Sequence, residues 1–327
     1  MPMNRFALIA IAATLCVISG AAPAQGTYPD RPIKLIVPFP AGGVNDTVAR
    51  SVAERMRTAL GVIVIENRGG AGGVIGASAV ARAEADGYTQ LLGSAGTHLV
   101  GPLTVTPRPY DPAKDFKSAG IVAVSGLAIC IHPSLPVKTM KAFVAYAGAH
   151  PRALSYASAG TGSATHLGAE LFKSLIRAPG ILHVPYRGGA QALGDLLGGH
   201  VPVSVLNISA QLIEFHRAGR VRVLAVTTAK RVATVPDIPT AIESGVPGMI
   251  ALNFAGLFLP AATPGVIVDR VSVAMRTALA DKGLQEVMSN AGMEVSADDT
   301  PDKAQRFVDS EITRWTPVVK SLGLKQN

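Results

Sequence analysis

The segment 33–60 constrains the fold of this chain most strongly. Residues Ile33–Val37 form a short apolar run rich in β-branched side chains, which predicts a buried strand of a parallel sheet. Prolines and a glycine pair end this strand, and Asp46–Leu60 then has the apolar spacing of an amphipathic helix, with Asn45 or Asp46 as the expected N-cap. Because a helix N-terminus presents free backbone N–H groups and the positive end of the helix dipole, this turn predicts a site for a small anion.

The loop Phe39–Asp46 matches neither of the common phosphate-binding motifs. It lacks the Lys-Ser/Thr pair of the P-loop and the G-x-G-x-x-G fingerprint of dinucleotide-binding proteins. We interpret it as a cradle in which backbone amides hold a carboxylate. Glycine followed by Asn or Asp is also ordinary chemistry for a strand-to-helix turn, and Asp46 is open to either a ligand contact or the capping of its own helix.

Similar glycine-rich loops recur after other predicted strands. Strand Val62–Glu66 precedes one of them, Tyr88–Leu92 leads into Gly93–His98, and Leu154–Ala157 leads into Ser158–His166, which repeats the string Ser-Ala-Gly-Thr. Repeated strand–loop–helix units predict a doubly wound α/β fold with its loops gathered at the carboxyl ends of the strands. The two repeated loops are expected to face one another across a cleft, unless the four small residues recur by chance.

The length of the chain and two long apolar runs predict two lobes. At 327 residues the chain is long enough for two α/β domains. The run Gly120–His132 exceeds an ordinary strand, which a strand continuing from one lobe into the other explains, and Leu252–Leu259 returns the chain to the first lobe. We expect residues 25–124 with 253–327 to form lobe 1 and residues 125–252 to form lobe 2, with hinges where the two strands cross.

Residues Met1–Ala24 have the pattern of a cleaved secretory signal peptide. Arg5 supplies the positive region and Phe6–Ile18 the apolar region, and the segment ends with an A-x-A cleavage site at Ala22–Ala24. The apolar region is short for a membrane anchor, and Cys16 follows a leucine where a lipoprotein signal requires a small residue. The pattern predicts a periplasmic protein.

Charge and cysteine content narrow the possible functions of the protein further. The formal net charge is +8, but the basic residues are dispersed, so we expect a solvated basic surface and no nucleic-acid partner. After cleavage only Cys130 remains, and its apolar neighbours predict a buried thiol without a disulfide. No cofactor is expected.

An ordered set of short strings runs along nearly the whole mature chain. They are Tyr28-Pro29, Ile36–Gly43 with Asp46, Glu66–Arg68 with Gly70–Gly73, Asp86–Tyr88, Tyr110–Pro112, Leu154–Ser158, Glu170–Phe172, His183–Tyr186, Leu224–Thr227, and Pro236-Asp237 with Pro239-Thr240. In this order they resemble the Bug family of periplasmic solute receptors of tripartite tricarboxylate transporters.

The resemblance implies an α/β fold of the type II periplasmic-binding-protein kind, with two doubly wound lobes joined by two crossing strands around a ligand cleft. It implies a small carboxylate enclosed mainly by backbone amides, Ser/Thr hydroxyls and ordered waters. The implied partners are the membrane components of the transporter or a sensor protein, and a monomer is the expected state. Family members often carry an acidic residue before the asparagine that matches Asn207, whereas this chain has Leu206, which makes amino acids less expected as ligands.

The candidate ligand-binding residues come from these loops. They are Phe39, Ala41, Gly42, Gly43, Asp46, Ala71, Gly72, Gly73, Ser94, Thr97, His98, Ser158, Gly160, Thr161, Ser163, Thr165, Arg187, Gly188 and Asn207. No catalytic or metal-ligating residue is expected.

Other classes of protein compete with a transport receptor. An exported hydrolase needs an activated nucleophile, but neither a G-x-S-x-G elbow nor an acid that orients His98 or His166 is found at the loop serines. A metal receptor needs clustered ligands, whereas the seven histidines are scattered. A receptor that senses its ligand for a signalling partner has the same sequence features as one that feeds a transporter.

Overall fold

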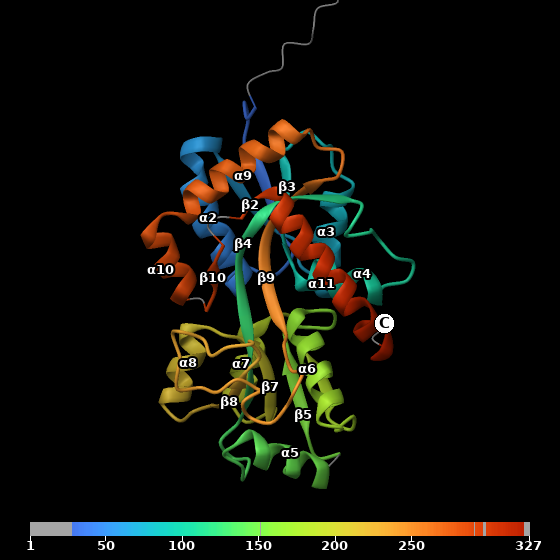
Figure 1. Cartoon of the computed structure of the whole chain (residues 1–327), viewed down its shortest axis with the longest axis vertical. Helices are drawn as coiled ribbons and strands as arrows, with labels where there is room; N and C mark the ends of the chain where they lie inside the picture. Colours follow the sequence, from blue (N-terminus) through green and yellow to red (C-terminus); the bar gives the residue numbers. More distant parts are fainter. Residues whose placement is uncertain (1–27, 151, 291, 297–298, 324–327) are drawn as a thin grey trace, which may run out of the picture. The chain divides into compact units, whose positions relative to one another are not determined.

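The computed structural model describes residues 28–150, 152–290, 292–296 and 299–323 (Figure 1). Contacts divide the chain into a unit that ends at Asp30 and a unit of residues 31–327, and the architecture below is that of the second unit. The predicted signal peptide Met1–Ala24 lies outside the described residues.

Two sheets share one strand. The first has the order β2-β1-β3-β9-β4-β10 and the second β8-β4-β7-β5-β6; β1–β3 are parallel to one another, as are β5–β7, and β4 and β9 run antiparallel to their neighbours. The strands are β1 (Ile33–Val37), β2 (Ile63–Asn67), β3 (Thr89–Ser94), β4 (Phe116–Ile131), β5 (Ser155–Ser158), β6 (Leu182–Pro185), β7 (Val203–Asn207), β8 (Arg222–Val226), β9 (Leu252–Pro260) and β10 (Glu294–Val295).

Strand β4 is the shared strand. It pairs with β9 as far as Gly126, and from Leu127 onward it pairs with β7 and β8. Figure 1 shows β4 and β9 side by side, leading from the region of α9–α11 toward the region of α5–α8. The long apolar run is therefore one strand that continues from sheet to sheet, as its length predicts. The lobe boundaries and the hinges stay predictions.

Helices cover both sheets. They are α2 (Val44–Leu60), α3 (Val74–Ala81), α4 (Gly101–Thr104), α5 (Met140–Ala149), α6 (Ala164–Leu175), α7 (Gly189–Leu197), α8 (Ala210–Arg217), α9 (Gly265–Leu279), α10 (Lys282–Asn290) and α11 (Pro301–Ser321), with single turns η1 (Ala71–Gly73) and η2 (Gly96–Val100). The string Asp281-Lys282-Gly283 predicts a break in the helical segment 264–290, and α9 and α10 are indeed separate there. A proline-led pattern predicts a short helix over Pro236–Gly245, which is wrong, because this segment forms a series of turns.

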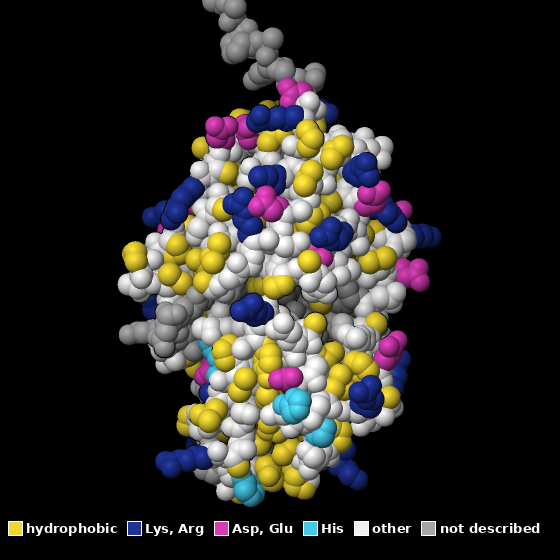
Figure 2. Space-filling model, turned by 180° about the vertical axis from the view of Figure 1, so that it is seen from behind, with side chains coloured by type: hydrophobic (Ala, Val, Ile, Leu, Met, Phe, Trp, Pro, Cys, Tyr) yellow, Lys and Arg dark blue, Asp and Glu magenta, His cyan; other side chains and the backbone are white. Residues whose placement is uncertain are grey.

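Helix α2 is amphipathic, as its apolar spacing predicts. Val48, Val52, Met56 and Leu60 are all buried against β1 and α9. Cys130 lies in the core without a disulfide partner, and burial raises the pKa of its thiol. On the surface, basic and acidic side chains are interspersed over the face shown in Figure 2, which fits the dispersed charge of the sequence.

Candidate functional site

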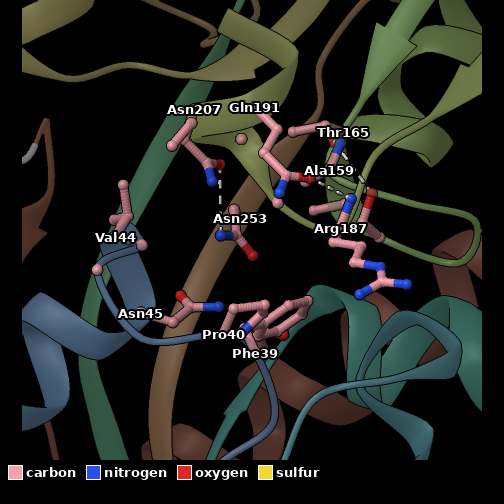
Figure 3. Close-up of a pocket in the computed structure, with 18 of the residues that line it drawn as sticks. Phe39, Pro40, Val44, Asn45, Ala159, Thr165, Arg187, Gln191, Asn207 and Asn253 are labelled. Carbon is pink, nitrogen blue, oxygen red and sulfur yellow. Dashed lines mark hydrogen bonds between the residues drawn. The ribbon is translucent and has the colours of Figure 1, made fainter. Parts of the chain in front are cut away.

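The carboxyl ends of several strands open into one cavity of about 330 Å³ (Figure 3). This is the expected position for a ligand in an open α/β sheet. Its wall consists of three backbone segments and three single side chains: Phe39–Asn45, Ala159 with Ser163–Thr165, and Arg187–Gln191, together with Ser94, Asn207 and Asn253.

Three helices begin at this cavity. The N-caps of α2 and α7 are Gly43 and Gly188, and neither has a side chain that could occupy the first amides of its helix. In α6 the Ser163 hydroxyl accepts a hydrogen bond from the amide of His166, which leaves the two earlier amides without that cap. Since first-turn N–H groups have no acceptor within their own helix, the three N-termini together provide several donors and three positive dipole ends.

The hydroxyls of Ser163 and Thr165 lie 3.0 Å apart and hydrogen-bond to each other. Thr165 also accepts from the amide of Ala159 at 2.9 Å. Two hydroxyl groups carry two protons, and their mutual bond uses only one of them. The second proton is therefore available to a ligand oxygen in the cavity.

The wall contains a single charged side chain. Arg187 is exposed, and its backbone N–H donates to the side-chain oxygen of Gln191 at 3.2 Å. Within the described part of the chain, no Asp or Glu lines this cavity. The field inside it is therefore positive and comes mainly from backbone dipoles, which favours an anion and disfavours an ammonium group.

Asp46 holds the first loop from behind rather than lining the cavity. Its carboxylate accepts from the Gly42 amide at 2.9 Å, from Arg50 at 3.0 Å and from Asn67 at 2.9 Å. Burial raises the pKa of Asp46, but the hydrogen bonds from Arg50, Gly42 and Asn67 outweigh it and lower the pKa overall. The carboxylate thus fixes the loop before α2. The predicted N-cap at Asn45 or Asp46 is wrong, because Gly43 occupies that position and the helix starts at Val44.

A second cavity of about 830 Å³ adjoins the first and shares Phe39 and Arg187 with it. Five further predicted residues line it: Ala71, Gly72, Gly73, Gly160 and Thr161. At its edge the loop before α3 meets the loop before α6, because a Cβ added at Gly72 would lie 2.7 Å from the carbonyl oxygen of Thr161.

The two Ser-Ala-Gly-Thr loops also meet. A Cβ added at Gly96 would lie 3.3 Å from the carbonyl oxygen of Gly162. The repeated loops therefore lie next to one another, but at this point they are in direct contact rather than separated by a cleft.

Thr97 and His98 lie behind the cavity wall, in the core. The Thr97 hydroxyl contacts the Nδ1 atom of His98 at 2.8 Å, and the His98 ring lies 4.0 Å from the ring of Phe258. Burial lowers the pKa of His98 to about 3, which keeps the imidazole neutral. The structure places both side chains among apolar residues, and neither lines either cavity.

Ser158 lies in a compact polar cluster beneath the loop that precedes α6. Its hydroxyl contacts the Nε2 atom of His183 at 2.7 Å, and the rings of His183 and His166 stack with centroids 4.1 Å apart. The Nδ1 atom of His166 accepts from the amide of Gly162 at 3.2 Å. Because Nδ1 of His166 accepts a hydrogen bond, that imidazole is neutral, and these contacts support the loop 158–165 from below.

We expect this histidine pair to make the stability of the protein depend on pH. Burial lowers the pKa of His166 to about 4 and that of His183 to about 3, the latter aided by the charge of its neighbours. Because the unfolded chain takes up these protons at about pH 6.5, stability is complete above that pH and is lost as the pH falls toward 4. For His166 alone the loss between about pH 6.5 and pH 4.5 is on the order of 2 kcal/mol.

Urea unfolding at a series of pH values measures this effect. A His166→Gln variant should lose about 2 kcal/mol less stability than the wild type over this range, with the rest of the decline coming from the buried His98 and His183. A His150→Gln variant, changed at an exposed position, should keep the wild-type decline. Equal slopes in all three proteins would contradict the assignment.

The structure adds cavity residues to the individual candidates. Pro40, Val44, Asn45, Ala159, Ala164, Gly189 and Ala190 lie within the predicted binding loops 39–46, 158–165 and 187–190 without being named as contacts, and Gln191 lies just beyond them. Asn253 lies in β9. Its side chain is the one amide in an otherwise apolar run, which is the sequence feature that could have indicated a role in the site. Of the predicted residues, the first cavity brings together Phe39, Ala41, Gly42, Gly43, Ser94, Ser163, Thr165, Arg187, Gly188 and Asn207.

The described ranges contain no group of three or more His, Cys, Asp or Glu side chains arranged to bind a metal ion. None of their helices combines the length and the hydropathy of a membrane span.

Comparison with known proteins identifies the family. The model of the tripartite tricarboxylate transporter family receptor, TctC, matches residues 48–324. The chain belongs to this receptor family. The resemblance drawn from the short strings is thereby confirmed, and the family is one of binding proteins rather than of enzymes.

Solved structures of similar proteins agree with the assignment of this chain to the TctC receptor family. The periplasmic binding protein BugD superposes with a TM-score of 0.84 at 36% identity, over 92% of this chain and 100% of that one. MatC from Rhodopseudomonas palustris, solved with bound malate, gives 0.83 at 32% identity, over 89% and 100%. Rpa4515 of the same organism, solved with adipate, gives 0.82 at 35% identity, over 91% and 99%. This chain therefore has the α/β periplasmic-binding-protein fold, and similar proteins bind carboxylates.

Proposed function

We propose that this TctC-family protein is a periplasmic receptor that captures a small carboxylate and delivers it to the membrane components of a tripartite tricarboxylate-type transporter. The observation that carries the proposal is the convergence of three helix N-termini on one cavity, in whose wall the described residues include no Asp or Glu. Anions bind at such N-termini because N–H donors and dipoles act together. The malate and adipate of the similar structures support a carboxylate as the ligand.

In the proposed mechanism, the carboxylate lies between the first turns of α2, α6 and α7. The amides of α2 come from one side, and those of α6 and α7 together with the hydroxyls of Ser163 and Thr165 come from the other. Water is excluded when these segments close on the ligand, and each hydrogen bond then acts in a lower dielectric. The positive charge of Arg187 at the shared edge of the two cavities attracts the anion from solution.

A thermal-shift screen of refolded, ligand-stripped protein tests the proposal. The panel pairs each carboxylic acid with its carboxamide and includes sugars and amino acids. A ligand at 100 times its dissociation constant should stabilise the protein by about 2.7 kcal/mol, which is a clear shift in Tm. Stabilisation by an acid but not by its amide supports the proposal, whereas stabilisation by sugars alone, or by no acid at all, contradicts it.

A further inference from the structure

Three residues in the wall of the first cavity each have a buried polar atom without a hydrogen-bond partner among the described residues. The atoms are Oδ1 of Asn45, Oγ of Ser94 and Oδ1 of Asn253. Ser94 is 2% exposed and Asn253 is 3% exposed. Buried polar atoms are nearly always paired in proteins, so unpaired ones in residues that line a cavity point to a group that completes them.

The fold brings these side chains into one wall. Ser94 is the last residue of β3 and lies opposite Ala255 of β9, and Asn253 lies two residues along β9 on the same face. The Nδ2 group of Asn253 reaches Oδ1 of Asn207 at 3.4 Å, which turns its own oxygen away from Asn207 (Figure 3). Asn45 approaches from the first turn of α2, beside the amides proposed to hold the carboxylate.

The chemistry of the unpaired atoms selects the group that they fit. The two amide oxygens accept hydrogen bonds, while the Ser94 hydroxyl both donates and accepts. A hydroxyl is a neutral group that pairs with the Ser94 hydroxyl and with one of the two amide oxygens, since its oxygen accepts from Ser94 and its single proton goes to an amide oxygen. A carbonyl group only accepts, and a methylene group does neither.

The charge of the cavity excludes the other strong donor, an ammonium group. An ammonium would lie among three positive helix ends and near Arg187, in a wall without Asp or Glu among the described residues. A buried charge without an opposite partner is strongly unfavourable, whereas a hydroxyl brings no charge.

We propose that Asn45, Ser94 and Asn253 form a subsite for a hydroxyl group of the ligand, so that the preferred ligand is a hydroxylated carboxylic acid. This inference rests on the proposed carboxylate site, because the hydroxyl is placed by the anchored carboxylate of the same molecule. The subsite makes Ser94 and Asn253 specificity-determining residues.

Calorimetric titration with matched pairs of acids tests the subsite. The pairs are malate and succinate, citrate and tricarballylate, and lactate and propionate, which differ only by one hydroxyl. In at least one pair the wild type should bind the hydroxylated acid at least ten times more tightly than its partner. Carboxylates that bind equally well with and without the hydroxyl overturn the subsite but leave the proposed function intact. A protein that binds none of the six acids, nor any acid of the thermal-shift panel, overturns both.

Two variants test whether Ser94 and Asn253 cause the preference for the hydroxylated acid. Ser94→Ala and Asn253→Leu should each reduce the preference for the hydroxylated acid by at least fivefold. The matched control is Ser272→Ala, because Ser272 is also buried with an unpartnered hydroxyl but lies in α9 and lines neither cavity. It should keep the full preference. If Ser94→Ala keeps it as well, and Asn253→Leu either keeps it or does not fold, the subsite assignment is wrong.

Discussion

Replacement of Ala190 by aspartate should abolish carboxylate binding while leaving the protein folded and slightly more stable. Ala190 lies in the first turn of α7 and lines the cavity, so a carboxylate there occupies the place proposed for the ligand. Two like charges about 4 Å apart repel by roughly 4 kcal/mol at an effective dielectric constant of about 20, which predicts a loss of affinity of roughly 100- to 1000-fold. An acidic residue in a first helical turn stabilises its helix by about 0.5 kcal/mol.

Opposite signs for affinity and stability distinguish this result from simple damage to the fold. Ala190→Asn is the matched control, because it has nearly the same shape without the charge. Dissociation constants from calorimetry and midpoints from urea unfolding measure the two effects. If the aspartate variant binds the ligand as tightly as the asparagine variant, the anion does not lie at the N-terminus of α7.

Gly72→Ala should weaken ligand binding by about 10- to 100-fold, although Gly72 does not line the first cavity. A Cβ at this position would lie 2.7 Å from the carbonyl oxygen of Thr161 and 2.8 Å from the carbonyl carbon of Gly162. Backbone atoms cannot move aside separately, so the loops before α3 and α6 must separate, at a cost of roughly 1–3 kcal/mol. The variant should therefore favour an open arrangement with weaker binding, and small-angle scattering of the ligand-bound protein should show a larger radius of gyration.

Gly61→Ala is the control for this substitution. Gly61 also has a φ of 64°, and its ψ of −147° is a less favourable conformation for alanine than the ψ of 19° at Gly72, but a Cβ there would meet nothing within 4 Å. The control should lose stability without losing affinity. Equal affinity in the two variants would show that the contact between Gly72 and Thr161 does not contribute to ligand binding.

Much of the site was predictable because its elements are local. Ile33–Val37 and the helix after it are fixed by apolar runs, prolines and glycines, whose preferences act over a few residues. The first-turn residues Val44 and Ala190 lie within the predicted binding loops but were not named as individual contacts, although free first-turn amides imply their participation.

Other features depended on contacts between distant segments. The sequence left Asp46 open between ligand contact and capping, and in the structure its carboxylate accepts from Gly42, Arg50 and Asn67 of β2 and so fixes the loop before α2. Thr97 and His98 follow β3 directly, yet their side chains turn into a core formed with Phe258 of β9. No local pattern shows which face of a turn the rest of the chain will cover.

By itself the sequence determined the α/β fold, the family and the presence of glycine-rich loops before helix N-termini, since these follow from periodicity, turn residues and ordered strings within short segments. Only the tertiary structure decided which loops meet. The contact of Gly72 with Thr161, the stacking of His166 on His183, and the wall of Asn45, Ser94 and Asn253 each join residues far apart in the chain. The physical reason is that burial and hydrogen-bond pairing are properties of the packed chain, and a residue's own neighbours in sequence do not fix them.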